Sequence, residues 1–159
     1  MNKVYLLMGG NEGNSHAYLE EAAANIRRQC GEITQRSSVY VTAAWGKKDQ
    51  PDFLNQALLL YTLLDPPALL ATLLNIEEKM GRKRREKFGP RVIDIDILFF
   101  NQSVVDLPQL KIPHPEIQHR RFALTPMAEL APDLEHPVLH KTIRQLLLEC
   151  GDPLNVKKI

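Results

Sequence analysis

Two aspartates, Asp94 and Asp96, stand at the centre of the apolar run VIDIDILFF (residues 92–100). Such a run predicts a buried strand, where aspartate is depleted and an unpaired carboxylate is costly. Side chains alternate along a strand, so both carboxylates lie on one face with their Cα atoms about 6.5–7 Å apart. The opposite face carries Ile93, Ile95, Ile97 and Phe99. Carboxylates so placed repel each other unless a cation lies between them or one takes up a proton.

The chemistry that suits this pair is the binding of a hard divalent cation. Two oxygen ligands with no histidine or cysteine beside them favour Mg²⁺, which takes further ligands from substrate phosphates. The alternative is an amphipathic strand that exposes two solvated carboxylates to water. A D-x-D pair by itself does not decide between these two interpretations.

The segment before this strand, GRKRREKFGPR (residues 81–91), is strongly basic. Glycine and proline near its ends predict a loop that can move over a site. Arginines beside a carboxylate–Mg²⁺ pair suit a polyphosphate, because metal and guanidinium together offset its charge during phosphoryl transfer. The loop therefore favours the metal interpretation over solvated carboxylates.

Polar and aromatic residues elsewhere could hold a flat heterocycle. An asparagine and aromatic planes suit such a ring, because the amide donates and accepts hydrogen bonds at once. Candidates are Trp45, Phe53, Asn55 and Phe122. His114, between two prolines and close to Arg120, could contact a phosphate or a base. GGNEGN (residues 9–14) fits neither the P-loop nor the dinucleotide-binding template, and we interpret it as a tight turn with close backbone packing.

Composition restricts the class of protein. The chain has 159 residues, enough for one domain, and its net charge of +1 argues against a general polyanion-binding protein. Cys30 and Cys150 make no disulfide framework, which favours a reducing compartment. No apolar run is long enough for a signal peptide or a membrane span. We expect a single cytoplasmic domain over residues 1–159.

The predicted elements that position these residues follow the order β-α-β-β-α-β. Hydrophobic periodicity predicts strands at 3–8, 32–41, 53–64 and 92–100. It predicts helices that begin at Asn14 or Ser15 and at Asp65-Pro66. This order is the ferredoxin-like α+β pattern, with two helices on one face of a mainly antiparallel sheet. The chain from residue 101 on is predicted to be a loop-rich C-terminal extension with helices around 122–131 and 142–150.

These stretches, in this order, resemble the 6-hydroxymethyl-7,8-dihydropterin pyrophosphokinase family of folate biosynthesis. The most specific part is KFGPRVIDIDIL (residues 87–98), and related stretches are GGN, DQPDFLN, PHP and RRFALTPMAELAP. The resemblance implies a ferredoxin-like fold. It also implies transfer of the β,γ-pyrophosphate of ATP to the pterin hydroxymethyl group, leaving AMP.

The resemblance further implies roles for single residues. Asp94 and Asp96 would hold two Mg²⁺ ions, and Arg82 and Arg91 would grip the phosphates as further catalytic residues. The ATP site would contain Leu70, Glu77, Arg82, Arg84, Arg91, Ile97, His114 and Arg120. The pterin site would contain Thr42, Trp45, Phe53, Asn55 and Phe122. Residues 43–52 and 82–91 would form mobile lids.

Two other functions stay open. One is a different Mg²⁺-dependent reaction on the same carboxylates, such as nucleotidyl transfer. The other is a ferredoxin-like RNA-binding or ligand-sensing module, although such RNA-binding sheets carry aromatics where this strand carries aspartates. As a pyrophosphokinase, the chain is expected to be a monomer, not fused to other folate enzymes. It would bind ATP and hydroxymethyl-dihydropterin, but neither nucleic acid nor membranes.

Overall fold

The computed structural model describes residues 1–43, 51–81 and 92–159 of the chain. Its main sheet contains β1 (Asn2–Gly10), β2 (Gly31–Arg36), β3 (Tyr40–Thr42), β4 (Phe53–Thr62), β5 (Asp94–Phe100) and β8 (Val156–Lys158). The strand order is β5-β1-β4-β3-β8, and β2 pairs with β4 along the same edge as β3. All of these pairs are antiparallel.

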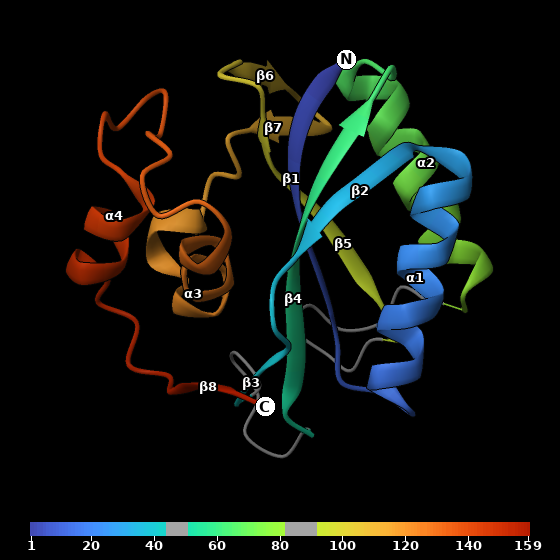
Figure 1. Ribbon diagram of the computed structural model, residues 1–159, viewed down its shortest axis with the longest axis horizontal. Helices are drawn as coiled ribbons and strands as arrows, with labels where there is room; N and C mark the ends of the chain where they lie inside the picture. The colour runs from blue at the N-terminus through green and yellow to red at the C-terminus, as the bar shows by residue number, and fades with distance from the viewer. Residues whose placement is uncertain (44–50, 82–91) are drawn as a thin grey trace.

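Helices cover both faces of this sheet (Figure 1). One face carries α1 (Ser15–Gln29) and α2 (Pro66–Lys79), and the other carries α3 (Arg121–Leu130) and α4 (Ile143–Glu149). A hairpin of β6 (Val105–Leu107) and β7 (Leu110–Ile112) follows β5, and the short 3-10 helix η1 (Ile117–His119) precedes α3. Within the described ranges, no helix combines the length and apolarity needed to cross a membrane.

The helices of the first face begin where the sequence predicted. Asn14 Oδ1 accepts a hydrogen bond from Ala17 N at 3.2 Å, and Asp65 Oδ1 accepts one from Ala68 N at 2.9 Å. Such caps satisfy backbone donors that have no partner within the first helical turn. Pro66 follows Asp65 at a position where a helix needs no N–H. Both predicted starts are therefore confirmed.

A hydrophobic cluster lies on each face of the sheet. Val4, Leu6 and Met8 of β1 pack in the cluster under α1 and α2. Tyr5 and Leu7 pack in the cluster under α3 and α4, because side chains alternate along a strand. The order β1-α1-β2-β4-α2-β5, with these antiparallel pairs, confirms the predicted ferredoxin-like core.

The predicted strand over residues 32–41 is divided into β2 and β3, because regular pairing with β4 stops at Ser37. The Ser37 hydroxyl accepts a hydrogen bond from Ala57 N at 2.9 Å, and Ser37 N donates one to Ala57 O at 2.9 Å. A side-chain oxygen thus takes the place of a backbone acceptor at this point of the ladder.

A second difference concerns β5, where the predicted alternation holds only as far as Leu98. The pairing with β1 shifts register between Tyr5, opposite Phe99, and Leu6, opposite Ile97, so that Leu98 is the extra residue of a bulge. Phe99 therefore packs with Leu98 in the cluster under α3 and α4. The prediction that Phe99 shares a face with Ile95 and Ile97 is wrong, whereas the alternation around the two aspartates is confirmed.

The C-terminal extension contains more regular structure than predicted. α3 and α4 correspond to the predicted helices, but β6, β7 and β8 lie in a region predicted to be rich in loops. Each of these strands has three residues, too few for alternation to be recognised. β8 pairs with β3 and so makes the C-terminus part of the main sheet.

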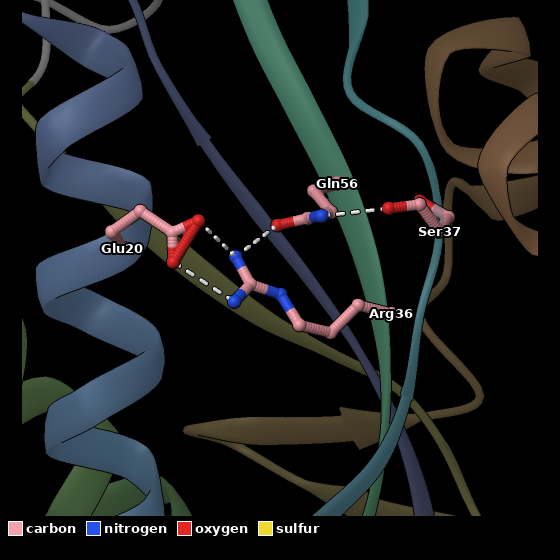
Figure 2. Close-up of polar contacts among 4 residues, drawn as sticks. All are labelled: Glu20, Arg36, Ser37 and Gln56. Carbon is pink, nitrogen blue, oxygen red and sulfur yellow. Dashed lines mark hydrogen bonds and ion pairs between the residues drawn. The ribbon is translucent and has the colours of Figure 1, made fainter.

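A polar network ties α1 to the division between β2 and β3 (Figure 2). Both terminal nitrogens of Arg36 donate to the carboxylate of Glu20, at 2.9 and 3.1 Å, and this bond lowers the pKa of Glu20. Arg36 Nη2 also donates to Gln56 Oε1 at 2.9 Å, and Gln56 Nε2 donates to Ser37 O at 2.6 Å. Gln56 therefore has a structural role on the α1 side of β4.

Candidate functional site

A row of residues crosses the sheet on the face covered by α3. Asp94 of β5 lies opposite Gly9 of β1, Gly9 opposite Asn55 of β4, and Asn55 opposite Tyr40 of β3. Residues paired in this way point to the same side of a sheet. Asp94 and Asn55, which are 39 positions apart in the sequence (94 minus 55), are thus separated only by one glycine.

Gly9 is the residue that lets the Asn55 side chain lie across β1. A Cβ atom built on Gly9 would be 2.3 Å from Asn55 Oδ1 and 3.3 Å from Leu54 O. Asn55, buried to 5% exposure, therefore occupies the space of the missing side chain. The predicted close packing at Gly9 is confirmed. The predicted tight turn does not include Gly9 and Gly10, which belong to β1, because the chain bends only after them, at residues 12–13.

Gly9→Ala is expected to lower the free energy of unfolding by about 1–3 kcal/mol, the usual cost of overpacking. Urea unfolding measures this change. Gly151→Ala is the matched control, because nothing lies within 4 Å of a Cβ built there. We expect the control to change stability by no more than about 0.5 kcal/mol. Small and equal effects of both substitutions would contradict the packing of Asn55 over Gly9.

Asp94 and Asp96 lie side by side along β5, both half-buried, on the same face as Asn55. Ile95 and Ile97 point to the opposite cluster, as predicted. Within the described residues, no group of three or more His, Cys, Asp or Glu side chains is arranged to hold a metal ion. Two carboxylates beside a glycine suit Mg²⁺, which needs few protein ligands when water and substrate phosphates supply the rest. The residues present therefore fit the predicted metal.

The predicted heterocycle residues of the sheet come together at the end of β3 and the start of β4. Thr42 lies opposite Phe53 in the ladder, two positions from the pair of Tyr40 and Asn55. The hydroxyl of Thr42, which is buried, donates to Asn155 O at 3.0 Å. That hydroxyl is therefore engaged with the C-terminal segment, so Thr42 can contribute to a ligand site mainly through its backbone.

The start of α3 supplies a second aromatic plane. The Arg120 guanidinium carbon lies 5.7 Å from the centroid of the Phe122 ring, a distance that permits a cation–π interaction. Phe122 is half-buried at the edge of the cluster under α3 and α4. The structure thus places the predicted cation and the predicted aromatic residue in contact.

His114 is held in one protonation state. Its Nδ1 accepts a hydrogen bond from Glu116 N at 3.1 Å, so a neutral ring carries its proton on Nε2. Burial, together with the positive charge of Arg120, lowers the pKa of His114 to about 4. At neutral pH the ring is therefore an uncharged donor.

The remaining predicted nucleotide residues line the outer edge of β5. Glu77 Oε2 accepts a hydrogen bond from Ile95 N at 2.6 Å, and His114 N donates to Leu98 O at 3.0 Å. Leu70, about two turns before Glu77 on the same side of α2, packs in the same cluster as Ile97, under α1 and α2. The edge strand is thus contacted by α2 and by the segment that leads to α3.

Some predicted residues cannot be placed, and one was missed. Trp45, Arg82, Arg84 and Arg91 lie outside the described residues, as do most of the two predicted lids. Asn11 was not singled out, yet it is buried to 3% exposure and its Nδ2 donates to Pro51 O at 3.0 Å. It connects the end of β1 to the chain entering β4, and the GGN motif was the only signal for it.

The site as a whole combines acidic, amide and aromatic groups. Two carboxylates lie at one end of the row on β5, and a buried amide lies on β4, on the other side of β1. Phe53 lies two positions before the amide on β4, and Phe122 belongs to α3, which packs on the same face of the sheet. Carboxylates of this kind bind a metal that carries phosphates, and an amide between aromatic planes binds a flat polar ring. The arrangement can therefore hold a phosphate donor next to a heterocyclic acceptor.

Comparisons with known proteins agree with this chemistry. A family model described as 7,8-dihydro-6-hydroxymethylpterin-pyrophosphokinase (HPPK) matches residues 5–132. A relative named 2-amino-4-hydroxy-6-hydroxymethyldihydropteridine pyrophosphokinase, from Synechocystis sp., is 44% identical over 141 residues, which are 88% of this chain and 72% of the relative. Proteins of the same name are 39% identical in Aquifex aeolicus, over 91% of this chain and 90% of the relative. In Methylorubrum extorquens the identity is 38%, over 100% and 99%.

Solved structures show the same fold. Wild-type Plasmodium falciparum HPPK-DHPS, crystallised with pteroate, superposes with a TM-score of 0.76 over 93% of this chain, at 21% identity. The chain spans only 42% of that protein's length. From the family model and the curated relatives together, the chain belongs to the 7,8-dihydro-6-hydroxymethylpterin-pyrophosphokinase family.

Proposed function

We propose that the face of the sheet beneath the start of α3 is where this chain joins its two substrates. The chain transfers pyrophosphate from ATP to the hydroxymethyl group of 6-hydroxymethyl-7,8-dihydropterin, giving AMP and the pterin diphosphate, in tetrahydrofolate biosynthesis. The hydroxyl oxygen attacks the β-phosphorus and releases its proton. The bond between the β-phosphorus and the oxygen that bridges to the α-phosphate breaks, and AMP leaves with that oxygen. The observation that carries the proposed location is the row Asp94–Gly9–Asn55.

Asp94 and Asp96 are proposed as the ligands of two Mg²⁺ ions. The support is their common face on β5 and their half-buried position. Bound Mg²⁺ would supply positive charge to the phosphate oxygens during transfer. Arg82 and Arg91, with Arg84 in support, are proposed to grip the same phosphates, and they lie outside the described residues.

The outer edge of β5 is proposed to receive the nucleotide. Leu70, Glu77 and Ile97 line it from the α2 side, and His114 and Arg120 line it from the segment leading to α3. His114, neutral at pH 7, can donate from Nε2 without adding charge. Arg120 can add a positive charge near the phosphates.

The pterin is proposed to lie between Phe53 and Phe122, with Asn55 facing the edge of its ring. The support is the buried Asn55 amide, held over Gly9, which can both donate and accept. Thr42 would contribute its backbone, since its hydroxyl is engaged with Asn155. Trp45 is the fifth proposed contact and lies outside the described residues.

The setting of the reaction is also a proposal. We expect residues 1–159 to form a single pyrophosphokinase domain, because both hydrophobic clusters share one sheet. A reducing, cytoplasmic location is supported by Cys30 and Cys150, which are both free. The protein is proposed to act as a monomer on small-molecule substrates.

A product assay tests the reaction and separates it from nucleotidyl transfer. The protein is incubated with ATP, Mg²⁺ and hydroxymethyl-dihydropterin, and the products are identified by mass spectrometry. We expect AMP and a pterin that carries two phosphates. Formation of ADP, or of free pyrophosphate with an AMP adduct, would contradict pyrophosphoryl transfer. The same assay with EDTA in place of Mg²⁺ is expected to show no product.

A further inference from the structure

The segment after α4 contacts both walls of the proposed pterin site. It leaves α4 at Cys150, passes the start of α3 and ends as β8 beside β3. In Figure 1 this segment runs from α4 beneath α3 to the C-terminus at β3. α3 carries Phe122, and the ladder of β3 and β4 carries Phe53 and Asn55. This segment thus contacts α3, which carries Phe122, and β3, which pairs with the strand that carries Phe53.

Its contact with α3 centres on Asp152, which is buried to 6% exposure. Asp152 Oδ2 accepts a hydrogen bond from Arg121 N at 3.1 Å, and Oδ1 accepts one from Leu154 N at 3.0 Å. The Arg121 side chain closes the junction from the other direction, with Nε donating to Asp152 O at 3.2 Å and Nη2 to Cys150 O at 2.8 Å. Three of these hydrogen bonds join the segment to Arg121, the first residue of α3. The fourth, from Leu154 N to Asp152, lies within the segment and orders it.

This junction replaces an ordinary helix cap. The N-cap residue of α3 is Arg120, whose side chain makes no capping hydrogen bond, because arginine has no acceptor. The orphan N–H groups at a helix start favour a negatively charged acceptor. Asp152 supplies that acceptor from 31 residues away, which leaves the Arg120 side chain beside Phe122.

The contact with the other wall is made by the residues that follow. Asn155 O accepts the hydroxyl hydrogen of Thr42, and Val156 lies opposite Thr42 in the β3–β8 ladder. Thr42 lies opposite Phe53. The separation between α3 and β3 is also set by Glu129, whose Oε1 accepts from the Tyr40 hydroxyl at 2.6 Å.

We propose that Asp152 and Arg121 are positioning residues for the pterin, which set where Phe122 lies relative to Phe53 and Asn55. The proposal rests on the proposed location of the pterin between these side chains. Neither residue needs to touch a substrate. Their effect is to fix the first turn of α3 against a segment that is itself fixed to β3.

Asp152→Ala is expected to raise the KM for hydroxymethyl-dihydropterin by about tenfold, the size of effect expected when one aromatic stacking contact is lost. The kcat at saturating pterin is expected to change by less than about twofold, because Asp94 and Asp96 are not attached to this junction. The KM for ATP is expected to rise less than the KM for pterin, because Arg120 is one of several proposed nucleotide contacts. Asp152→Asn keeps one oxygen acceptor and should give a smaller rise. Arg121→Met removes the two side-chain hydrogen bonds and should raise the same KM.

The matched control is Thr142→Ala. Thr142 caps α4, where its hydroxyl accepts from Gln145 N at 3.2 Å, so this variant also loses a cap. We expect a lower Tm for both Asp152→Ala and Thr142→Ala, but a raised pterin KM only for Asp152→Ala. Kinetics are measured well below the lower Tm. A lowered Tm with an unchanged pterin KM in the Asp152 and Arg121 variants would overturn the positioning role.

Phe122→Ala separates this proposal from the proposed site. A raised pterin KM in Phe122→Ala, with no change in the Asp152 variants, would leave the site standing and refute the junction. A raised KM in the Asp152 variants with no effect of Phe122→Ala would exclude Phe122 as a pterin contact and would also overturn the positioning role, because the junction is proposed to act through Phe122. If none of these variants changes the KM, both proposals are wrong.

Discussion

Replacing Asp96 by asparagine is expected to lower kcat by about 10³-fold or more, and Asp94→Asn should act in the same direction. A metal held at this pair would lower the free energy of the transition state by several kcal/mol. Each 1.36 kcal/mol corresponds to about a factor of ten in rate. Asparagine keeps the volume of the side chain but removes the charge. Because both aspartates are half-buried on a strand whose other face stays packed, the fold should survive.

Turnover at saturating ATP and pterin, followed across a Mg²⁺ titration, measures this effect. We expect a large rise in the Mg²⁺ concentration that gives half-maximal rate, together with the loss of kcat. Asp106→Asn is the matched control, since Asp106 is exposed on β6 and paired with Lys111. A variant at Asp96 that kept wild-type kcat and Mg²⁺ dependence would refute the proposed metal role.

The second large effect is expected for Asn55→Ala, which should lower kcat/KM for the pterin by about 10²-fold. A donor or acceptor on the pterin that loses its partner in a buried site weakens binding by about 1–3 kcal/mol for each lost hydrogen bond. The Asn55 amide can make more than one such hydrogen bond. Binding of ATP should be unchanged, because the nucleotide residues lie on β5, α2 and the start of α3. Steady-state kinetics with each substrate varied in turn separates the two effects.

Gln56→Ala is the control for this substitution, because it removes a neighbouring amide that points to the other face of β4. Gln56 is bonded to Arg36 and Ser37 in the network shown in Figure 2, so its loss should lower Tm without changing the KM for pterin. Equal effects of Asn55→Ala and Gln56→Ala on pterin kinetics would mean that Asn55 acts through stability alone.

Much of the fold was predictable because its signals are local. The cap residues Asn14 and Asp65 precede amphipathic runs, and such signals need only a few neighbouring residues. The prediction of one continuous strand over 32–41 failed because Ser37 interrupts it through a hydrogen bond to Ala57, 20 residues away. The bulge at Leu98 was not predicted for the same reason, since only the pairing with β1 defines it.

The site was predictable in composition but not in geometry. The two aspartates were recognised from their spacing on one strand, and the family resemblance is confirmed by the match over residues 5–132. Gly9 was assigned to a turn, because a glycine gives no indication of which side chain fills the space above it. Only the register of β4 against β1 shows that this side chain is Asn55.

The sequence by itself determined the family, the reaction and the strand that carries both carboxylates, because a strand's alternation and an ordered set of motifs are properties of the chain read in one dimension. The tertiary structure alone decided which residues meet. Pairing β1 between β4 and β5 places Asn55 and Asp94 on either side of Gly9. The fold of the last residues back onto α3 brings Asp152 to a helix start that its own N-cap residue cannot cap. Both are contacts between distant segments, and no local preference of the chain encodes them.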